Sequence, residues 1–206
     1  MPTGERWQSM WDGLGVAHPP AGLMDELLIR YGEPHRRYHT ARHLDECFEK
    51  LDEGRSLATF PAEIELALWF HDAIYDVKRR DNEKKSAEWA RSSAAAAGLA
   101  AESAERVYSL IMATRHETVP RGVDAEILVD VDLSILGAGP RRFDEYERQI
   151  RDEYGWVPGF VFRAKRKAIL EQFLARAAIF STKYFFERYE APARINIARS
   201  LEKLSR

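Results

Sequence analysis

The sequence predicts an all-α protein, and three observations support this prediction. Apolar residues recur at spacings of three and four nearly everywhere, as Trp7, Met10 and Leu14 illustrate. Runs of alternating β-branched residues between hairpin turns are lacking. Segments rich in glycine and proline separate successive helical stretches. We therefore expect a helical bundle of about 9–10 helices.

Three helices are expected in the first quarter of the chain. The first covers residues 7–14 and the second residues 21–30, and two consecutive prolines interrupt the chain between them. A loop at 32–38 follows. Thr40 is then expected to cap a third helix, which contains His43.

Two further helices have clear start or stop signals. The fourth starts near Pro61, a residue favoured in the first turn, and its apolar run ends at His71. After a polar segment at 76–80, Asp81 opens a long helix, which Gly98 is expected to terminate as a C-cap.

Five helices are expected in the remainder of the chain, at about residues 101–114, 124–136, 141–154, 160–178 and 183–204. The chain has no internal repeat and no linker long enough to divide it. We therefore expect a single domain over residues 1–206.

Composition restricts the classes of partner. Hydrophobic residues make up 45% and charged residues 31% of the 206 residues, and the net charge is -2. This balance argues against an extended nucleic-acid surface or a general attraction to anionic membranes. No apolar run is long enough for a secretion signal or a membrane span. Cys47 is the only cysteine, so intrachain disulfides and cysteine-rich zinc sites are excluded, and a cytoplasmic location is expected. A homodimer is compatible with the sequence.

The candidate chemistry lies in histidines and aspartates. His39 and His43 are four residues apart and can address one pocket if both are helical. His71 and Asp72 close a strongly apolar run, where a buried charged pair needs a compensating partner such as a metal ion. Imidazole and carboxylate together suit a divalent transition metal.

Other interpretations remain open for each element of this pattern. A His-x-x-x-His pair alone is more often a surface feature or satisfied core, and a lone His-Asp dipeptide is a weaker signal still. An aspartate inside an apolar helix, as at Asp132, is more informative because burying an unpaired carboxylate costs several kcal/mol. A metalloprotease is disfavoured because Thr40 stands where His-Glu-x-x-His requires glutamate. A Cys47–His43 nucleophilic pair has the right spacing but lacks a recognisable orienting carboxylate.

The order His…His-Asp…Asp on helices resembles the HD superfamily of metal-dependent phosphohydrolases. Residues 38–43, Tyr-His-Thr-Ala-Arg-His, are similar to the Tyr-His-Asn-x-x-His string of cyclic nucleotide phosphodiesterases, which share the HD fold. Thr40 stands where those enzymes have asparagine, and this chain is far shorter. Residues 132–134, Asp-Leu-Ser, are similar to their downstream Asp-Leu-Ser.

The chain as a whole is more similar to a bacterial family described as predicted HD phosphohydrolases. The shared features are Tyr-His-x-x-x-His, Trp-Phe-His-Asp, Asn-Glu-x-x-Ser-Ala, Asp-x-Asp-Leu-x-Ile-Leu-Gly and Arg-x-Glu-Tyr. The resemblance covers about residues 31–155, which we expect to form the metal-site core, with the C-terminal helices at 160–204 packing on it.

The resemblance implies a ligand set. His43, His71, Asp72 and Asp132 are the expected metal ligands, with Asp130 as the alternative to Asp132. Because the two aspartates point about 160° apart on a helix, only one is expected to reach the ion. One or two ions are expected, drawn from Mn, Fe, Co, Ni, Mg or Zn, and Asp72 would bridge a pair.

The resemblance also implies metal-assisted hydrolysis of a phosphomonoester or phosphodiester, of a nucleotide or a small phosphorylated metabolite. His39 is the expected general acid and Asp72 the second catalytic residue. The expected substrate-binding residues are Tyr38, Glu83, His116, Arg151, Lys165 and Arg166. The alternative function is a non-catalytic HD module that holds a metal ion and binds a nucleotide as a sensor or partner-docking domain.

Overall fold

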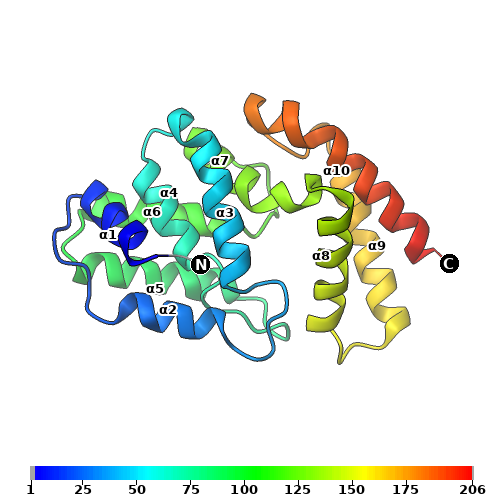
Figure 1. Cartoon of the computed structure of the whole chain (residues 1–206), viewed down its shortest axis with the longest axis horizontal. Coiled ribbons are helices and arrows are strands. Elements are labelled where there is room, and N and C mark those ends of the chain that lie inside the picture. The colour runs from blue at the N-terminus through cyan, green and yellow to red at the C-terminus, as the bar shows by residue number, and fades with distance from the viewer. Residues whose placement is uncertain (1–2, 206) are drawn as a thin grey trace. The chain divides into compact units, whose positions relative to one another are not determined.

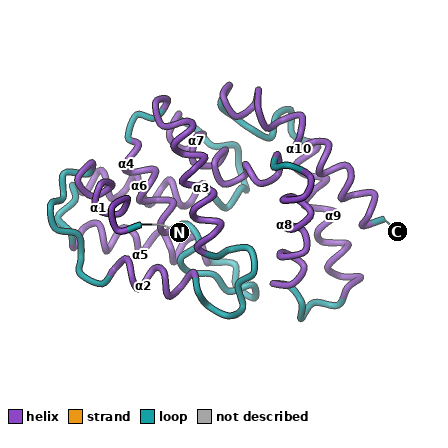
Figure 2. Tube along the Cα trace, viewed as in Figure 1, coloured by secondary structure: helices purple, strands orange, loops and turns teal. Residues whose placement is uncertain are grey.

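The computed structural model describes residues 3–205, which form helices and connecting loops without any strand (Figure 2). The α-helices are α1 (Gly4–Gly13), α2 (Leu23–Tyr31), α3 (Ala41–Gly54), α4 (Pro61–Phe70), α5 (Asn82–Ala96), α6 (Ala101–Ala113), α7 (Val123–Leu133), α8 (Pro140–Glu153), α9 (Gly159–Ala175) and α10 (Lys183–Leu204). Two short 3₁₀ helices, η1 (Arg55–Leu57) and η2 (Ser134–Gly137), complete the described elements. The prediction of an all-α protein is confirmed.

Packing divides the chain into two compact units, residues 1–129 and residues 130–206. The boundary falls inside α7, after Val129. The single-domain organisation expected from the sequence stays a prediction, as does the packing of the C-terminal helices on the metal-site core.

Helix α4 is the centre of the first unit. Every residue from Ala62 to Phe70 is buried, and the helix packs against α1, α3, α5 and α6 (Figure 1). A helix that is apolar on all sides is stable only when it is enclosed by protein. The two acidic residues on α4 are neutralised by arginines: Glu63 pairs with Arg106, and Glu65 pairs with Arg55 at 2.6 Å.

Helices α5 and α6 pack on each other across the turn that Gly98 makes possible. Gly98 has a φ of 82°, in the left-handed region that favours glycine. Its amide donates to Ala95, and the Leu99 amide donates to Ala94, the paired hydrogen bonds of a Schellman motif. The expected C-cap at Gly98 is confirmed.

The ends of several predicted helices differ from the structure; the first, for example, spans Gly4–Gly13 and not residues 7–14, and two others have an identifiable cause or continuation. The helix expected at 124–136 stops at Leu133 and continues as η2, and the helix expected at 160–178 stops at Ala175. At the end of α9, the Arg194 guanidinium donates hydrogen bonds to the carbonyls of Leu174 and Arg176. A side chain from a distant part of the sequence thus supplies the donors for these carbonyls at the helix end. Local sequence patterns carry no signal for such a partner.

In the second unit, α10 packs against η2 and α9. Asn196 donates to the carbonyls of Leu136 and Ala138, and Gly137 lies so close to α10 that an added Cβ would stand 2.7 Å from the Tyr189 carbonyl oxygen. Small size at position 137 therefore sets how closely the two elements approach. Across the two units, none of the helices within residues 3–205 is both long and apolar enough to cross a membrane.

Candidate metal centre

His43 lies in the first turn of α3, where its side chain is 2% exposed. Thr40 occupies the N-cap position, as expected, but its hydroxyl donates to the Tyr38 carbonyl at 3.4 Å instead of accepting from the helix. Thr40 therefore shapes the turn that precedes α3. The prediction of its position is confirmed, and the predicted capping bond is wrong.

His71 lies at the C-terminal end of α4 and is 1% exposed. Its Nδ1 lies 2.7 Å from the Leu68 carbonyl oxygen. Because a carbonyl only accepts, Nδ1 carries the proton and Nε2 keeps its lone pair. This is the tautomer that a metal-ligating histidine needs.

Three donor atoms of the first unit converge at one point. The Nε2 atoms of His43 and His71 are 3.2 Å apart, and Oδ2 of Asp72 lies 3.0 Å from Nε2 of His71 and 3.6 Å from Nε2 of His43. A circle through three points at these separations has a radius of about 1.9 Å, just under the roughly 2.0–2.2 Å of a bond from nitrogen or oxygen to zinc. The spacing of these three donors is therefore compatible with a divalent ion, which His43, His71 and Asp72 would hold.

The electrostatics of Asp72 agree with this arrangement. Burial by itself would raise the pKa of Asp72, but the imidazoles of His71, His39 and His43 hold that pKa well below its usual range. Asp72 is therefore a carboxylate at neutral pH, the form that binds a metal.

Cys47 lies one turn after His43 on α3 and is buried. Its Sγ is 3.7 Å from Nδ1 and 3.7 Å from Nε2 of His43. The sulfur and the nearest nitrogens of His43 and His71 all lie within 4.8 Å of one another. Sequence reasoning did not include Cys47 among the ligands, although its spacing of four from His43 was a usable signal.

Arg36 joins the two segments that carry the ligands. Its buried guanidinium donates to the carbonyls of His39 at 3.0 Å, Asp72 at 2.7 Å and Ala73 at 3.0 Å, and Nε lies 3.2 Å from Glu33. The loop before α3 is thereby fixed to the turn after α4. Sequence reasoning missed this residue, because an arginine that binds main-chain oxygens has no local signature.

His39, the expected general acid, lies in the turn that precedes α3 and is partly exposed. Its ring centroid is 5.9 Å from that of His43 and 4.2 Å from that of Tyr75. Its charge contributes to the low pKa of Asp72, which places it next to the donor cluster. Tyr38, expected to stack on a substrate, is instead 4% exposed and packs its ring 4.6 Å from the His43 ring.

Glu83 interacts electrostatically with Asp72 and with His116. Burial, followed by the negative charge of Asp72, raises the pKa of Glu83, whereas Arg115 and His116 lower it. His116 has a φ of 55°, which is rare for a residue other than glycine and marks a tightly constrained turn after α6. Glu83 therefore lies within electrostatic range of Asp72, Arg115 and His116, all in the same unit.

Asp130, the alternative ligand, has a structural role in the second unit. Its Oδ1 accepts from the Ser181 amide at 2.8 Å, and Oδ2 accepts from the amide and hydroxyl of Thr182 at 2.7 Å. The carboxylate thus satisfies the backbone where α10 begins. Asp132 lies on the last turn of the same helix, α7, beyond the first unit. Its role as a ligand stays a prediction.

The basic residues expected to bind phosphate all lie in the second unit. Arg151 donates to the carbonyls of Tyr154 and Val157, and buried Arg166 donates to Tyr146 and Glu147. Both guanidinium groups are therefore engaged in holding α8 and its following turn to α9. Lys165 is exposed on α9.

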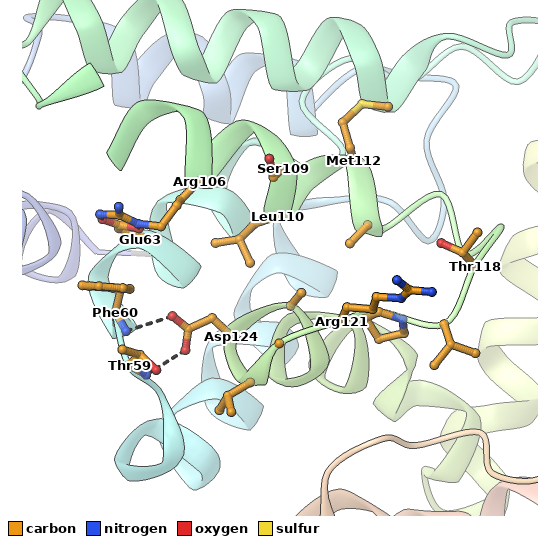
Figure 3. Close-up of a pocket in the computed structure, with 16 residues that line it drawn as sticks. Thr59, Phe60, Glu63, Arg106, Ser109, Leu110, Met112, Thr118, Arg121 and Asp124 are labelled. Carbon is orange, nitrogen blue, oxygen red and sulfur yellow. Dashed lines mark hydrogen bonds and ion pairs between the residues drawn. The ribbon is translucent and has the colours of Figure 1, made fainter. Parts of the chain in front are cut away.

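A cavity of about 1030 Å³ in the first unit does not contain the donor cluster (Figure 3). It lies between the start of α4, the end of α6 and the segment leading into α7. Asp124 is one of the residues that line it, and its carboxylate accepts hydrogen bonds from the main-chain amides of Thr59 and Phe60. Its lining is mainly apolar, with the Glu63–Arg106 pair on one side, and offers no set of converging donors.

These observations describe a buried cluster of donors in the first unit, consistent with a metal centre. A scan of family models finds no match for this chain, and searches of curated proteins and of solved structures find no similar protein.

Proposed function

We propose that this protein is a metal-dependent phosphohydrolase. The observation that carries the proposal is the convergence of His43, His71 and Asp72 within 3.0–3.6 Å of one another. Two imidazoles and one carboxylate form a donor set typical of catalytic divalent ions. The sequence resemblance to HD phosphohydrolases supports the same assignment and adds Asp132 as the proposed fourth ligand.

The proposed chemistry divides between the ion and the residues around it. A bound ion supplies Lewis acidity, which polarises a phosphoryl oxygen and lowers the pKa of a coordinated water. His39 would give a proton to the leaving oxygen as the phosphorus–oxygen bond breaks, and the water whose oxygen bonds to phosphorus would release one proton to solvent. Arg115, which pairs with Glu117 at 2.7 Å, is the arginine proposed to supply positive charge for the substrate phosphate. The proposed substrate is a nucleotide or a small phosphorylated metabolite.

Metal analysis and a substrate screen test this proposal. Wild-type protein purified without chelator is assayed for bound metal and for hydrolysis of phosphomonoesters, phosphodiesters and nucleotides, beside His71→Ala and Asp72→Ala. Loss of a residue that only orients a ligand costs about 10–100-fold, so each ligand variant is expected to lose more than about 100-fold of the activity. His18→Ala, which changes an exposed histidine in a loop of the same unit, is the matched control and should retain both metal and activity.

Two results would overturn the proposal. If wild type carries no divalent metal under any loading condition, the metal centre is wrong. If it binds metal and nucleotide but remains as inert as the two ligand variants, the protein is a binding module and not an enzyme.

A further inference from the structure

The proposed hydrolase chemistry does not use the cavity of about 1030 Å³ in the first unit. Every residue that lines this cavity falls within 1–129, and none is a proposed metal ligand. Small-molecule sites usually have volumes of about 300–1,000 Å³, so the cavity is large enough for a small ligand. Binding of a ligand here does not depend on the proposed metal centre.

Apolar side chains that solvent reaches are gathered around this cavity. Phe60, Val119 and Val123 line it and are 42%, 70% and 48% exposed. Leu110 and Met112 of α6 contribute further apolar surface (Figure 3). Exposed apolar side chains that occur singly are normal, but several around one concave surface indicate a binding site. The lining therefore favours a ligand with an apolar body.

Most charged groups of the lining are already compensated by other protein groups. The two carboxylate oxygens of Glu63 accept from the Arg106 guanidinium at 2.6 and 2.8 Å. The Asp124 carboxylate accepts from the main-chain amides of Thr59 and Phe60 at 2.7 and 3.0 Å. Neither carboxylate is therefore left to attract a cationic ligand.

Arg121 is the remaining charged residue of the lining. Within residues 3–205, its guanidinium forms no hydrogen bond or ion pair. In Figure 3, Arg121 lies on the segment leading into α7 and Met112 lies on α6, with the cavity between them. A guanidinium offers five N–H donors in a planar fork that matches an anionic head group. Because Arg121 is exposed, such a head group would lie at the rim of the cavity, in contact with water.

The number of free charges selects the kind of anion. A carboxylate carries one negative charge, which the single guanidinium of Arg121 compensates. A phosphate monoester carries close to two at neutral pH, so part of its charge would stay uncompensated by the lining residues. A monocarboxylate is therefore the better complement of this cavity.

We propose that the cavity binds a small amphiphile with an aliphatic body and one carboxylate, as in a medium-chain fatty acid. The aliphatic chain lies against Leu110 and Met112, and the carboxylate pairs with Arg121. Phe60 is the one aromatic residue of the lining, and the Arg106 guanidinium covers its ring at 4.4 Å from the centroid. An aliphatic body therefore matches the lining better than an aromatic one.

Methyl NMR tests this assignment at the site itself. Of the methionines within residues 3–205, Met112 alone lines the cavity, whereas Met10 is fully buried elsewhere in the unit. The methionine methyl groups are labelled with ¹³C, and Met112→Leu identifies the Met112 resonance. Octanoate, 1-octanol, octylamine and octyl phosphate are titrated in turn, so that only the head group differs. We expect octanoate to move the Met112 resonance, to leave Met10 in place and to bind about fivefold more tightly than 1-octanol.

Two variants separate the charge from the cavity. Arg121→Gln should lower the affinity for octanoate about fivefold, to that for 1-octanol, and should leave the affinity for 1-octanol unchanged. Ala113→Trp places a large side chain in the cavity and should abolish binding of both compounds. Arg80→Gln and Ala96→Trp change exposed residues that do not line the cavity, so these matched controls should behave like wild type.

Several results would overturn the proposal. Equal affinities of wild type for octanoate, 1-octanol and octylamine would rule out the role of Arg121, and tighter binding of octyl phosphate would rule out the carboxylate. A Met112 resonance that octanoate does not move would rule out the cavity as the site.

A Met112 resonance that moves with protein concentration before any ligand is added would identify a second copy of the chain as the occupant and contradict the proposal. Wild type and Arg121→Gln decide the question if Ala113→Trp does not fold. None of these measurements involves the metal ligands, so the proposed function stands or falls separately.

Discussion

Arg36 shows how much of the candidate site depends on a residue outside the donor set. Its guanidinium donates to three main-chain oxygens, two of them on Asp72 and Ala73 directly after α4. Its planar fork reaches several acceptors at once, which a lysine ammonium does not. The turn that carries two proposed ligands is therefore held in place by a side chain that touches neither of their donor atoms.

Replacing Arg36 tests this role. Arg36→Met leaves buried carbonyls without donors, so we expect the free energy of unfolding to fall by about 3 kcal/mol. Metal affinity should fall by about 10–100-fold because the ligands are no longer oriented. Urea unfolding and metal titration measure the two effects. Arg80→Met, an exposed arginine in the loop before α5, is the control and should change neither.

Asp130 and Asp132 are neighbours on one helix with different expected roles, and the pair of asparagine variants separates them. In Asp130→Asn one of the two acceptor oxygens becomes an NH2 group, which cannot accept from Ser181 or Thr182, so we expect a loss of about 2–3 kcal/mol in the free energy of unfolding. Asp132→Asn should instead lower metal affinity with little effect on the stability of metal-free protein. If Asp132→Asn leaves metal affinity unchanged, Asp132 is not a ligand.

At the scale of elements, the contact between η2 and α10 depends on the missing side chain of Gly137. Gly137→Ala would place a Cβ 2.7 Å from the Tyr189 carbonyl oxygen and 2.8 Å from the Tyr189 Cβ. One of the two elements must move, at a cost of about 1–3 kcal/mol. Gly139→Ala, two residues later, meets no atom within 4 Å and is the matched control. Equal urea midpoints for the two variants would contradict this role of Gly137 in the packing.

The helices could be predicted from the sequence where short stretches of sequence determine them. Apolar spacing and prolines located the helices, and Gly98 adopts the left-handed conformation that its position required. The exact ends were less predictable, because Arg194 satisfies the end of α9 from a distant helix.

The sequence indicated which residues belong to the candidate site better than it indicated how they contact one another. The resemblance singled out His43, His71 and Asp72, and the structure brings these three together. It did not single out Arg36, whose partners are main-chain atoms, or Cys47, whose spacing was interpreted only as a possible nucleophilic pair. Such contacts depend on how helices pack, which no local pattern encodes.

At the scale of the whole molecule, metal binding should be linked to stability. The proposed ligands on α3 and at the end of α4 are held together only in the folded state, so a bound ion favours folding. At a free metal concentration of about 100 times the dissociation constant, the gain is about 2.7 kcal/mol, or about 5–10 °C in Tm for a chain of this size.

Thermal unfolding with and without chelator measures this linkage. The wild type should lose the increment when the chelator is added, and His71→Ala should show no increment under either condition. An equal response of both proteins to the metal would mean that the ion binds elsewhere.

The hydrogen bonds of Arg36 affect which residues near the site can be substituted. All three carbonyls belong to the main chain, so the attachment is indifferent to which side chains stand at positions 39, 72 and 73. The donor at position 72 can therefore be exchanged, for instance by Asp72→His or Asp72→Glu, without releasing the segment that presents it. Position 72 is therefore the place in this protein where a ligand could be replaced while its main chain stays anchored.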